Sequence, residues 1–294
     1  MTHQPQTATT YPDRARFETV AVDENVRIAR DTYRIRFAFP RMAAVFLPGQ
    51  FLMMRLAGDE AHLLGRPMAL YDVVRDGRGT AVGVDIVYMA VGRMTRRLAS
   101  LRPGARIEAW GPLGNGFPPA EAEHLVMVAG GIGQTPFLAL AQESLGRTCY
   151  GDPPRSVPRA RSVSLCFGAQ SADLLGGVEN FRAAAVDVHL ATDDGTAGHH
   201  GLVTDLVRPL VEPLRPSVRI VCCGPEAMMA ATARIAGELG VRCHVSLETP
   251  MACGIGICFS CVARIRDADG GWDYRRTCVE GPVFDATDVI FDDP

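Results

Sequence analysis

Four cysteines near the C-terminal end constrain this chain more than any other feature. Cys253, Cys258 and Cys261 follow the spacing C-x4-C-x2-C, and Cys278 comes after sixteen further residues. This spacing is typical of plant-type [2Fe–2S] sites, in which a tight loop surrounds the cluster and a remote fourth cysteine completes it. Two glycines inside the loop allow it to turn sharply, because they lack a Cβ atom. The sequence therefore predicts a [2Fe–2S] cluster held by these four thiolates.

Zinc is the alternative interpretation, because four cysteines also form structural zinc sites. Zinc ligands usually arrive as two short-spaced pairs, whereas three of these cysteines are close together and one is remote. The pattern favours iron over zinc or an unliganded core.

Length and composition limit the remaining possibilities. A chain of 294 residues that is 47% hydrophobic is expected to form two or three domains. The net charge of −3 argues against nucleic acid or an anionic membrane as a partner. All thirty basic residues are Arg, which excludes Schiff-base lysines and lysine-dependent P-loops. No long apolar run or secretory signal is visible, so we expect a cytoplasmic protein.

The other cysteines are expected to be reduced, since disulfides are rare in the cytoplasm. Cys149, Cys166, Cys222 and Cys243 are isolated or lie in apolar runs, which predicts buried thiols. The segment 150–160 is rich in Pro and Arg and is expected to be a surface loop.

The spacing of apolar runs and turn residues along the chain predicts a multidomain protein that combines α+β and α/β structure. Residues 1–15 are polar and are expected to be a disordered tail. Residues 16–118 alternate in short runs separated by Gly and Pro, which predicts an antiparallel barrel with a short helix at 93–100. Residues 119–245 alternate strand, turn and helix, which predicts a parallel α/β domain. Residues 246–294 would form a small cluster domain.

Two strand–helix junctions in the α/β part have the chemistry of nucleotide-binding turns. In the first, we expect Thr135 to be the N-cap and Pro136 the first helical residue, so that the helix N-terminus can hold a pyrophosphate. The second junction would lie at the same carboxyl edge of the sheet, where ligands of such sheets bind. Ordinary turn chemistry is the alternative at either junction alone. The candidate nucleotide residues are Gly130, Gly131, Gly133, Thr135, Pro136, Cys223, Gly224 and Pro225.

The barrel contains two candidate anion contacts. Arg66 precedes Pro67 at the start of a predicted strand, and its planar guanidinium suits a diphosphate. Gly92 and Thr95 begin a predicted helix that could hold the same group through backbone N–H groups and a hydroxyl. An Arg-Pro pair is otherwise usually a strand edge.

In this order, the motifs resemble the ferredoxin reductase-like superfamily, and within it the electron-transfer subunits of class 1B dihydroorotate dehydrogenases. The resemblance covers nearly the whole chain after the tail. Its most specific part runs from Ser246 through the cysteine loop to the Cys278–Phe284 ending, and the segment Gly111–Phe117 resembles the one that closes the family's barrel. It implies an FAD-binding barrel, an NAD-binding domain and a [2Fe–2S] domain. The FAD contacts it implies are Arg66, Pro67, Met68, Ala69, Tyr88, Gly92 and Thr95.

Three positions refine this expectation. Ala69 stands where the superfamily usually has Ser or Thr near flavin N5, so a side-chain hydrogen bond there would be absent. Met94 stands where glycine is common, which requires a negative φ. Asp193 or Asp194 could hold the adenosine 2′-hydroxyl of NAD, although a solvated turn is the alternative.

The resemblance implies that NADH reduces FAD, that electrons pass singly to the cluster, and that they then reach FMN in a separate catalytic subunit. Cys223 would lie on the nicotinamide side, and the assembly would be a heterotetramer. A related NAD(P)H-dependent ferredoxin or sulfur reductase subunit with another acceptor is one alternative. A non-redox, zinc-stabilised binding module is the other.

Overall fold

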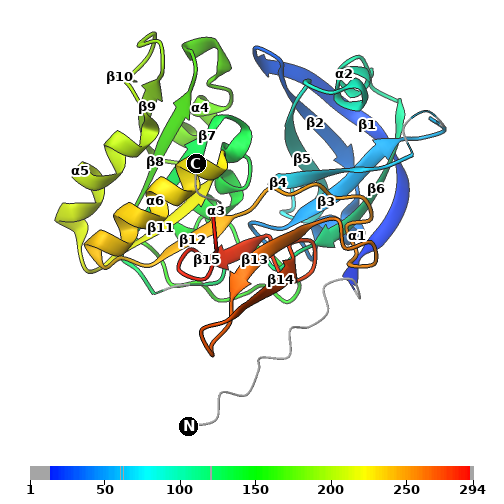
Figure 1. Ribbon diagram of the computed structural model, residues 1–294. Helices are drawn as coiled ribbons and strands as arrows, with labels where there is room; N and C mark the ends of the chain where they lie inside the picture. The colour runs from blue at the N-terminus through cyan, green and yellow to red at the C-terminus, as the bar shows by residue number, and fades with distance from the viewer. Residues whose placement is uncertain (1–13, 60, 62, 120, 292–294) are drawn as a thin grey trace.

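The computed structural model describes residues 14–59, 61, 63–119 and 121–291. The predicted tail lies almost entirely outside the described residues. The described chain forms a barrel, a helix-covered sheet beside it and a small hairpin below both (Figure 1). Within this part of the chain, no helix has the length and apolarity needed to span a membrane.

The barrel is closed by six antiparallel strands in the order β1-β2-β5-β4-β3-β6. Alternation decides which side chains fill it, because successive residues of a strand point to opposite faces. Leu52, Met68 and Leu70 point inward to the core, together with Ile35 and Phe37. The strands are β1 (Arg16–Ala29), β2 (Thr32–Ala38), β3 (Phe51–Leu56), β4 (Arg66–Arg75), β5 (Ala81–Met89) and β6 (Arg106–Leu113), with short helices α1 (Pro40–Ala43) and α2 (Arg93–Ala99).

Helix α2 confirms the short helix predicted at 93–100. Met94 is buried in the barrel core and is not among the residues with positive φ, as its replacement of glycine requires.

The second part is a seven-stranded sheet in the order β10-β9-β8-β7-β11-β12-β15, parallel except for β15. Its central strands are continuous apolar runs, as expected for a sheet covered on both faces. The strands are β7 (His124–Gly130), β8 (Ser162–Ala169), β9 (Asp187–Thr192), β10 (His199–His200), β11 (Val218–Cys223), β12 (Cys243–Ser246) and β15 (Val283–Asp285). The helices are α3 (Phe137–Ser144), α4 (Val178–Ala183), α5 (Val207–Val211) and α6 (Glu226–Leu239).

The C-terminal segment is joined to both other parts. It forms the hairpin β13 (Val262–Arg266) and β14 (Trp272–Arg276), then returns as β15 to pair with β12. Asn115 in the barrel-closing segment holds this ending: its Nδ2 donates to the Val283 carbonyl over 2.7 Å, and its Oδ1 accepts from the Val283 N–H over 3.1 Å. The domain boundaries remain a prediction, and the sheet itself extends across the one placed at 245/246.

The segment 150–160 is a loop that lies largely at the surface, as predicted, but two of its residues anchor it. Tyr150 is fully buried, and its hydroxyl donates to Asp72 Oδ1 of β4 over 2.7 Å. Arg155 donates to Glu143 and to the Phe117 carbonyl. These bonds tie the loop to both domains, while residues 152–154, 156, 158 and 159 are exposed.

Cys149 also departs from the prediction, because it is exposed while Cys166, Cys222 and Cys243 are buried as expected. It lies in the turn after α3, where its carbonyl accepts a hydrogen bond from Arg75, so the backbone is anchored and the thiol is not needed in the core.

Candidate functional site

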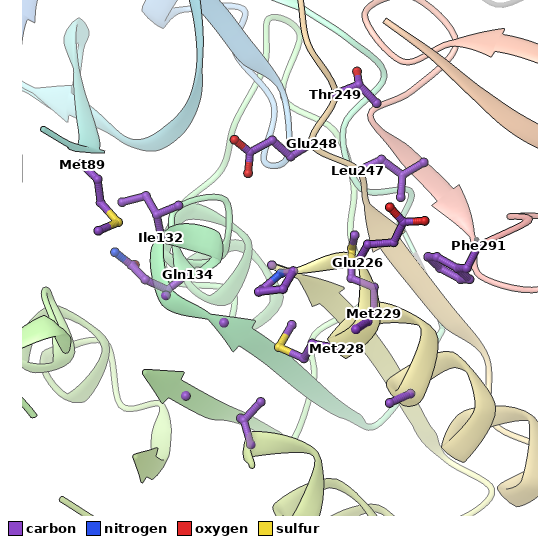
Figure 2. Close-up of a pocket in the computed structure, with 18 of the residues that line it drawn as sticks. Met89, Ile132, Gln134, Glu226, Met228, Met229, Leu247, Glu248, Thr249 and Phe291 are labelled. Carbon is purple, nitrogen blue, oxygen red and sulfur yellow. The ribbon is translucent and has the colours of Figure 1, made fainter. Parts of the chain in front are cut away.

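A cleft of about 1630 Å³ lies between the barrel and the carboxyl edge of the sheet. Figure 2 shows Met89, Ile132 and Gln134 on one side of it, with Glu226, Leu247 and Phe291 on the other. The predicted contacts that line it come from both domains: Arg66, Pro67, Gly130, Gly131, Asp193, Gly224 and Pro225. The remaining predicted flavin and nucleotide residues are not among those that line it.

The glycine-rich turn after β7 differs from the prediction. Residues Gly131–Gln134 form a 3-10 turn, and α3 begins at Phe137 with Pro136 as N-cap. Thr135 was wrongly predicted as the N-cap: its N–H donates to the Ile132 carbonyl, and its φ of −60° and ψ of −37° are already helical. The 3-10 turn gives Thr135 helical angles before the α-helix begins, so the helix start moves past Thr135. Pro136, predicted as the first helical residue, is instead the N-cap with φ of −78° and ψ of 1°.

The predicted glycines have two different roles. A Cβ on Gly133 would lie 2.1 Å from the Cys223 carbonyl oxygen, and one on Gly224 would lie 2.9 Å from the Gly130 nitrogen. These residues allow the two strand–helix junctions to pack backbone against backbone. Gly131 has a φ of +54° and open space where a Cβ would be. Its backbone is therefore the part of the turn that a ligand can approach most closely.

Gln134 is a cleft residue to which the sequence interpretation assigned no role. Its side chain is 1% exposed, it lines the cleft, and its Oε1 has no hydrogen-bond partner in the described structure. A buried amide oxygen without a partner is costly unless a ligand or water donates to it. Nicotinamide carries an amide N–H₂ and flavin an N3–H, so this acceptor fits the groups that the cleft is expected to bind. The sequence feature that could have indicated this role is a long polar side chain inside the glycine-rich turn, between Gly133 and Thr135.

Cys223 ends β11 and is half-buried. Burial raises the pKa of the Cys223 thiol to about 12, with a further contribution from the nearby Glu248 carboxylate, so the thiol is neutral at neutral pH. The Ser246 side chain hydrogen-bonds to it. Cys223 packs against the core of the sheet at the second strand–helix junction.

The predicted FAD residues of the barrel occupy distinct positions. Arg66 is exposed at the cleft, where its Nη1 donates to the carbonyls of Leu64 and Gly65. The Thr95 hydroxyl accepts from the Gly92 N–H over 3.0 Å, which fixes the start of α2.

Met68 and Tyr88 point away from the cleft. Both side chains are buried in the barrel core, and the Tyr88 hydroxyl donates to Asn25. Any contact these two residues make with a ligand would come from their backbone. Ala69 is half-buried on the opposite face of β4.

Asp193 follows β9 at the adenosine end expected for the cleft. Its backbone N–H donates to the Ala169 carbonyl, and the residue is exposed and lines the cleft. The neighbouring Asp194 instead accepts from the Thr196 N–H and hydroxyl. The two candidates are thus separated: Asp194 stabilises the turn, and Asp193 faces the ligand space.

The four cluster cysteines differ in burial. Cys261 and Cys278 are buried together in one apolar cluster, whereas Cys253 is half-buried and Cys258 is exposed in the loop between Met251 and Ser260. Across residues 14–291, excepting positions 60, 62 and 120, no three Cys, His, Asp or Glu side chains surround one point closely enough for a single metal ion. The four thiols have the residue type and the loop spacing that a [2Fe–2S] cluster needs.

The loop also supplies the surroundings that an iron–sulfur cluster needs. The Ile255 N–H donates to Cys253 Sγ over 3.4 Å. Gly254 and Gly256 have positive φ values of 74° and 85°, which keeps the loop tight as predicted. Cys261 and Cys278 are buried against Phe51, Met53 and Leu113 of the barrel.

Barrel, cleft and the four thiols define an oxidoreductase of the flavin and nicotinamide class with an iron–sulfur centre. Residues 19–117 match the oxidoreductase FAD-binding domain, and residues 127–234 match the oxidoreductase NAD-binding domain. Residues 248–290 match the iron-sulfur cluster binding domain of dihydroorotate dehydrogenase B.

Similar proteins of known name identify the particular family within this class. The chain is 32% identical over 278 residues to the dihydroorotate dehydrogenase B (NAD(+)) electron transfer subunit of Fusobacterium nucleatum subsp. nucleatum, covering 93% of this chain and 98% of that protein. It is 34% identical over 273 residues to the subunit of the same name from Bacillus velezensis, covering 92% and 97%. The chain belongs to the family of dihydroorotate dehydrogenase B electron transfer subunits.

Solved structures agree on the architecture. That of an NADH-dependent reduced ferredoxin-NADP oxidoreductase superposes with a TM-score of 0.76 at 26% identity, over 92% of this chain and 90% of that one. Phthalate dioxygenase reductase shares the fold with a TM-score of 0.59 at 18% identity, over 90% and 94%. The predicted fold class and the three predicted cofactors are confirmed, and the individual contact residues stay predictions.

Proposed function

We propose that this chain takes electrons from NADH and delivers them, by way of FAD and a [2Fe–2S] cluster, to the catalytic subunit of a dihydroorotate dehydrogenase in pyrimidine biosynthesis. The observation that carries the proposal is the presence of FAD-binding, NAD-binding and cluster-binding parts in one chain of this family. A bound FAD supplies the chemistry that joins a two-electron hydride donor to a one-electron cluster.

The residues of the cleft have complementary tasks in this proposal. Arg66 and the start of α2 at Gly92–Thr95 hold the FAD diphosphate, while the β4 segment Pro67–Ala69 supports the flavin ring. The open backbone at Gly131 and the junction at Gly224–Pro225 hold the nicotinamide dinucleotide, and Asp193 accepts from its adenosine ribose. Gln134 orients whichever ring presents an N–H to its unpartnered oxygen.

The acceptor in this proposal is an FMN-containing catalytic subunit in a heterotetramer. Support comes from the cluster loop, which exposes Ile257 by 74%, Phe259 by 62% and Ile255 by 37%. Contiguous apolar side chains on a surface mark an interaction site. A partner seated on them would lie directly over the cluster and shield it from water.

Two alternatives predict different behaviour. A ferredoxin or sulfur reductase subunit would bind the same cofactors and lack a dihydroorotate-oxidising partner; it is less favoured, because the curated relatives at 32–34% identity are dihydroorotate dehydrogenase subunits. A zinc-stabilised module would be colourless and would not react with NADH.

The test is an anaerobic absorption spectrum of the purified chain, followed by coexpression with an FMN-containing dihydroorotate dehydrogenase. We expect flavin bands and broad iron–sulfur absorbance that bleach on addition of NADH, and a complex that reduces NAD⁺ with dihydroorotate. A colourless zinc protein, or a bleaching protein that associates with no such partner, would contradict the proposal.

A further inference from the structure

One face of the barrel wall carries both predicted cofactor sites. Strand β3 lies between β4 and β6, and Met53 is directly opposite Pro67 on β4 and Trp110 on β6. Residues that face each other on neighbouring strands point to the same side of the sheet. Pro67 and Ala69 of the flavin strand therefore share the outer face of the barrel with Met53 and Trp110.

The cluster loop is packed on this same outer face. A Cβ on Gly254 would lie 2.5 Å from Met53 Cγ and 3.1 Å from Leu113 Cδ1, so the loop backbone rests on β3 and β6. Neighbouring strands are about 4.8 Å apart. The flavin strand β4 and the cluster loop are consequently separated by the width of one strand, β3.

Trp110 contacts both the cluster loop and the residue that precedes the flavin strand β4. Its indole Nε1 donates to the carbonyl of the cluster ligand Cys253 over 3.1 Å. Its ring lies against Gly65, where an added Cβ would be only 2.5 Å from Trp110 Cη2, and Gly65 immediately precedes Arg66. Phe17 covers the outer side of the indole at 6.0 Å between ring centroids.

We infer that Trp110 is a positioning residue that holds the cluster loop at a fixed place relative to the flavin strand, and so sets the rate of electron transfer from FAD to the cluster. The inference rests on the proposed function. The indole remains chemically unchanged: electrons move from reduced flavin to oxidised cluster, and Trp110 fixes the separation over which they move. A tether of this kind limits how often the loop moves away from the barrel.

The test compares Trp110→Phe with wild type and with Trp272→Phe, which changes the chain's other tryptophan on the exposed face of β14. Phe retains an aromatic ring and removes the donor. We expect hydrogen exchange of the loop amides of residues 254–258 to become about fivefold faster in Trp110→Phe, as the loss of one hydrogen bond implies. Trp272→Phe should match wild type. Exchange can be measured on the full chain with or without its cluster.

Rapid mixing with NADH gives the second readout. We expect flavin bleaching in Trp110→Phe at the wild-type rate, FAD content unchanged, and cluster bleaching slowed about fivefold or more, with altered electron paramagnetic resonance of the reduced cluster. Wild-type exchange and wild-type cluster reduction in Trp110→Phe would overturn the inference, and so would parallel losses of FAD and cluster, which indicate general misfolding. If wild type itself shows no cluster bleaching with NADH, the proposed function fails instead.

Discussion

At the scale of single residues, we expect Asp193 to decide between two closely similar ligands, NADH and NADPH. It is the only carboxylate among the predicted nucleotide contacts that lines the cleft in the described structure. A carboxylate can accept hydrogen bonds from the hydroxyls of an adenosine ribose, whereas it repels the 2′-phosphate of NADPH.

Asp193→Arg is expected to shift preference from NADH to NADPH by about tenfold or more, because a guanidinium forms charge-assisted bonds to phosphate. The measurement is the ratio of kcat/KM for the two nucleotides with a dye acceptor. Asp194→Arg, in the same turn but bonded to Thr196, is the matched control. An unchanged ratio in Asp193→Arg would remove Asp193 from the ribose site.

Cys258→Ser is expected to abolish cluster binding, because a serine hydroxyl is not deprotonated like a ligating thiolate. FAD content and NADH-to-dye activity should persist, since the Cys258 side chain is exposed and does not line the cleft. Iron content and the visible spectrum measure the outcome. Cys149→Ser changes another exposed thiol and should retain the cluster. Loss of FAD reduction in Cys258→Ser would contradict the proposed order of electron flow.

At the scale of elements, the most consequential feature is the return of the chain from the cluster loop to the sheet. Strand β15 pairs with β12, and the Leu247 N–H donates to the Pro282 carbonyl. On the barrel side, the Asn115 N–H donates to the Gly281 carbonyl over 2.7 Å. The barrel-closing segment and the C-terminal ending therefore fasten three parts of the molecule at one point.

Asn115→Ala is expected to lower the free energy of unfolding by about 2 kcal/mol, because two partly buried hydrogen bonds to Val283 are lost. Urea unfolding followed by fluorescence measures the change. Asn180→Ala on the exposed start of α4 should have little effect. Equal free energies of unfolding for the two variants would show that the Asn115–Val283 hydrogen bonds do not stabilise the fold.

At the scale of the whole molecule, two features are energetically unfavourable in the isolated chain: a buried charge and an exposed apolar surface. Arg219 is buried on β11 with Nε and Nη2 unpartnered, and its charge is felt by His244 on β12. The exposed cluster loop, in contrast, leaves apolar side chains for another protein to cover.

Stability is expected to fall as the pH drops from about 6.5 to about 4. Burial, and secondarily Arg219, lower the pKa of His244 from 6.5 to about 4, while Asp285 opposes this shift. The unfolded chain therefore binds more protons in this window, so the free energy of unfolding rises with pH across it. His244→Phe should reduce the loss between pH 7 and pH 5 by about 2 kcal/mol. The exposed His200→Phe is the control, and identical pH profiles of His244→Phe and wild type would refute the assignment.

Ile257→Asp is expected to weaken association with the catalytic subunit by about tenfold or more, because a charge would be buried at the centre of an apolar contact. Cluster content should be retained, since the Ile257 side chain is 74% exposed. Sedimentation or calorimetric titration against the partner measures the effect. Val26→Asp, on barrel strand β1, tests a charge at another exposed apolar position. If Ile257→Asp and Val26→Asp bind the catalytic subunit with equal affinity, the cluster loop is not the docking surface.

Local spacing determined much of this protein in advance. The cysteine loop, the glycines at two strand–helix junctions and the Arg66-Pro67 strand are interpretable because each acts within a few residues, and short-range geometry follows from residue type. The barrel and the parallel sheet follow similarly from the period of the apolar residues.

Contacts between distant segments were decided only by the tertiary structure. The sequence could not show that Gly133 accommodates the Cys223 backbone, that Gln134 has an unpartnered oxygen in the cleft, or that Asn115 holds Val283. Nor could it place the indole of Trp110 between Gly65 and Cys253. Such contacts depend on how the strands close and pack, which is a property of the whole core and has no local sequence pattern.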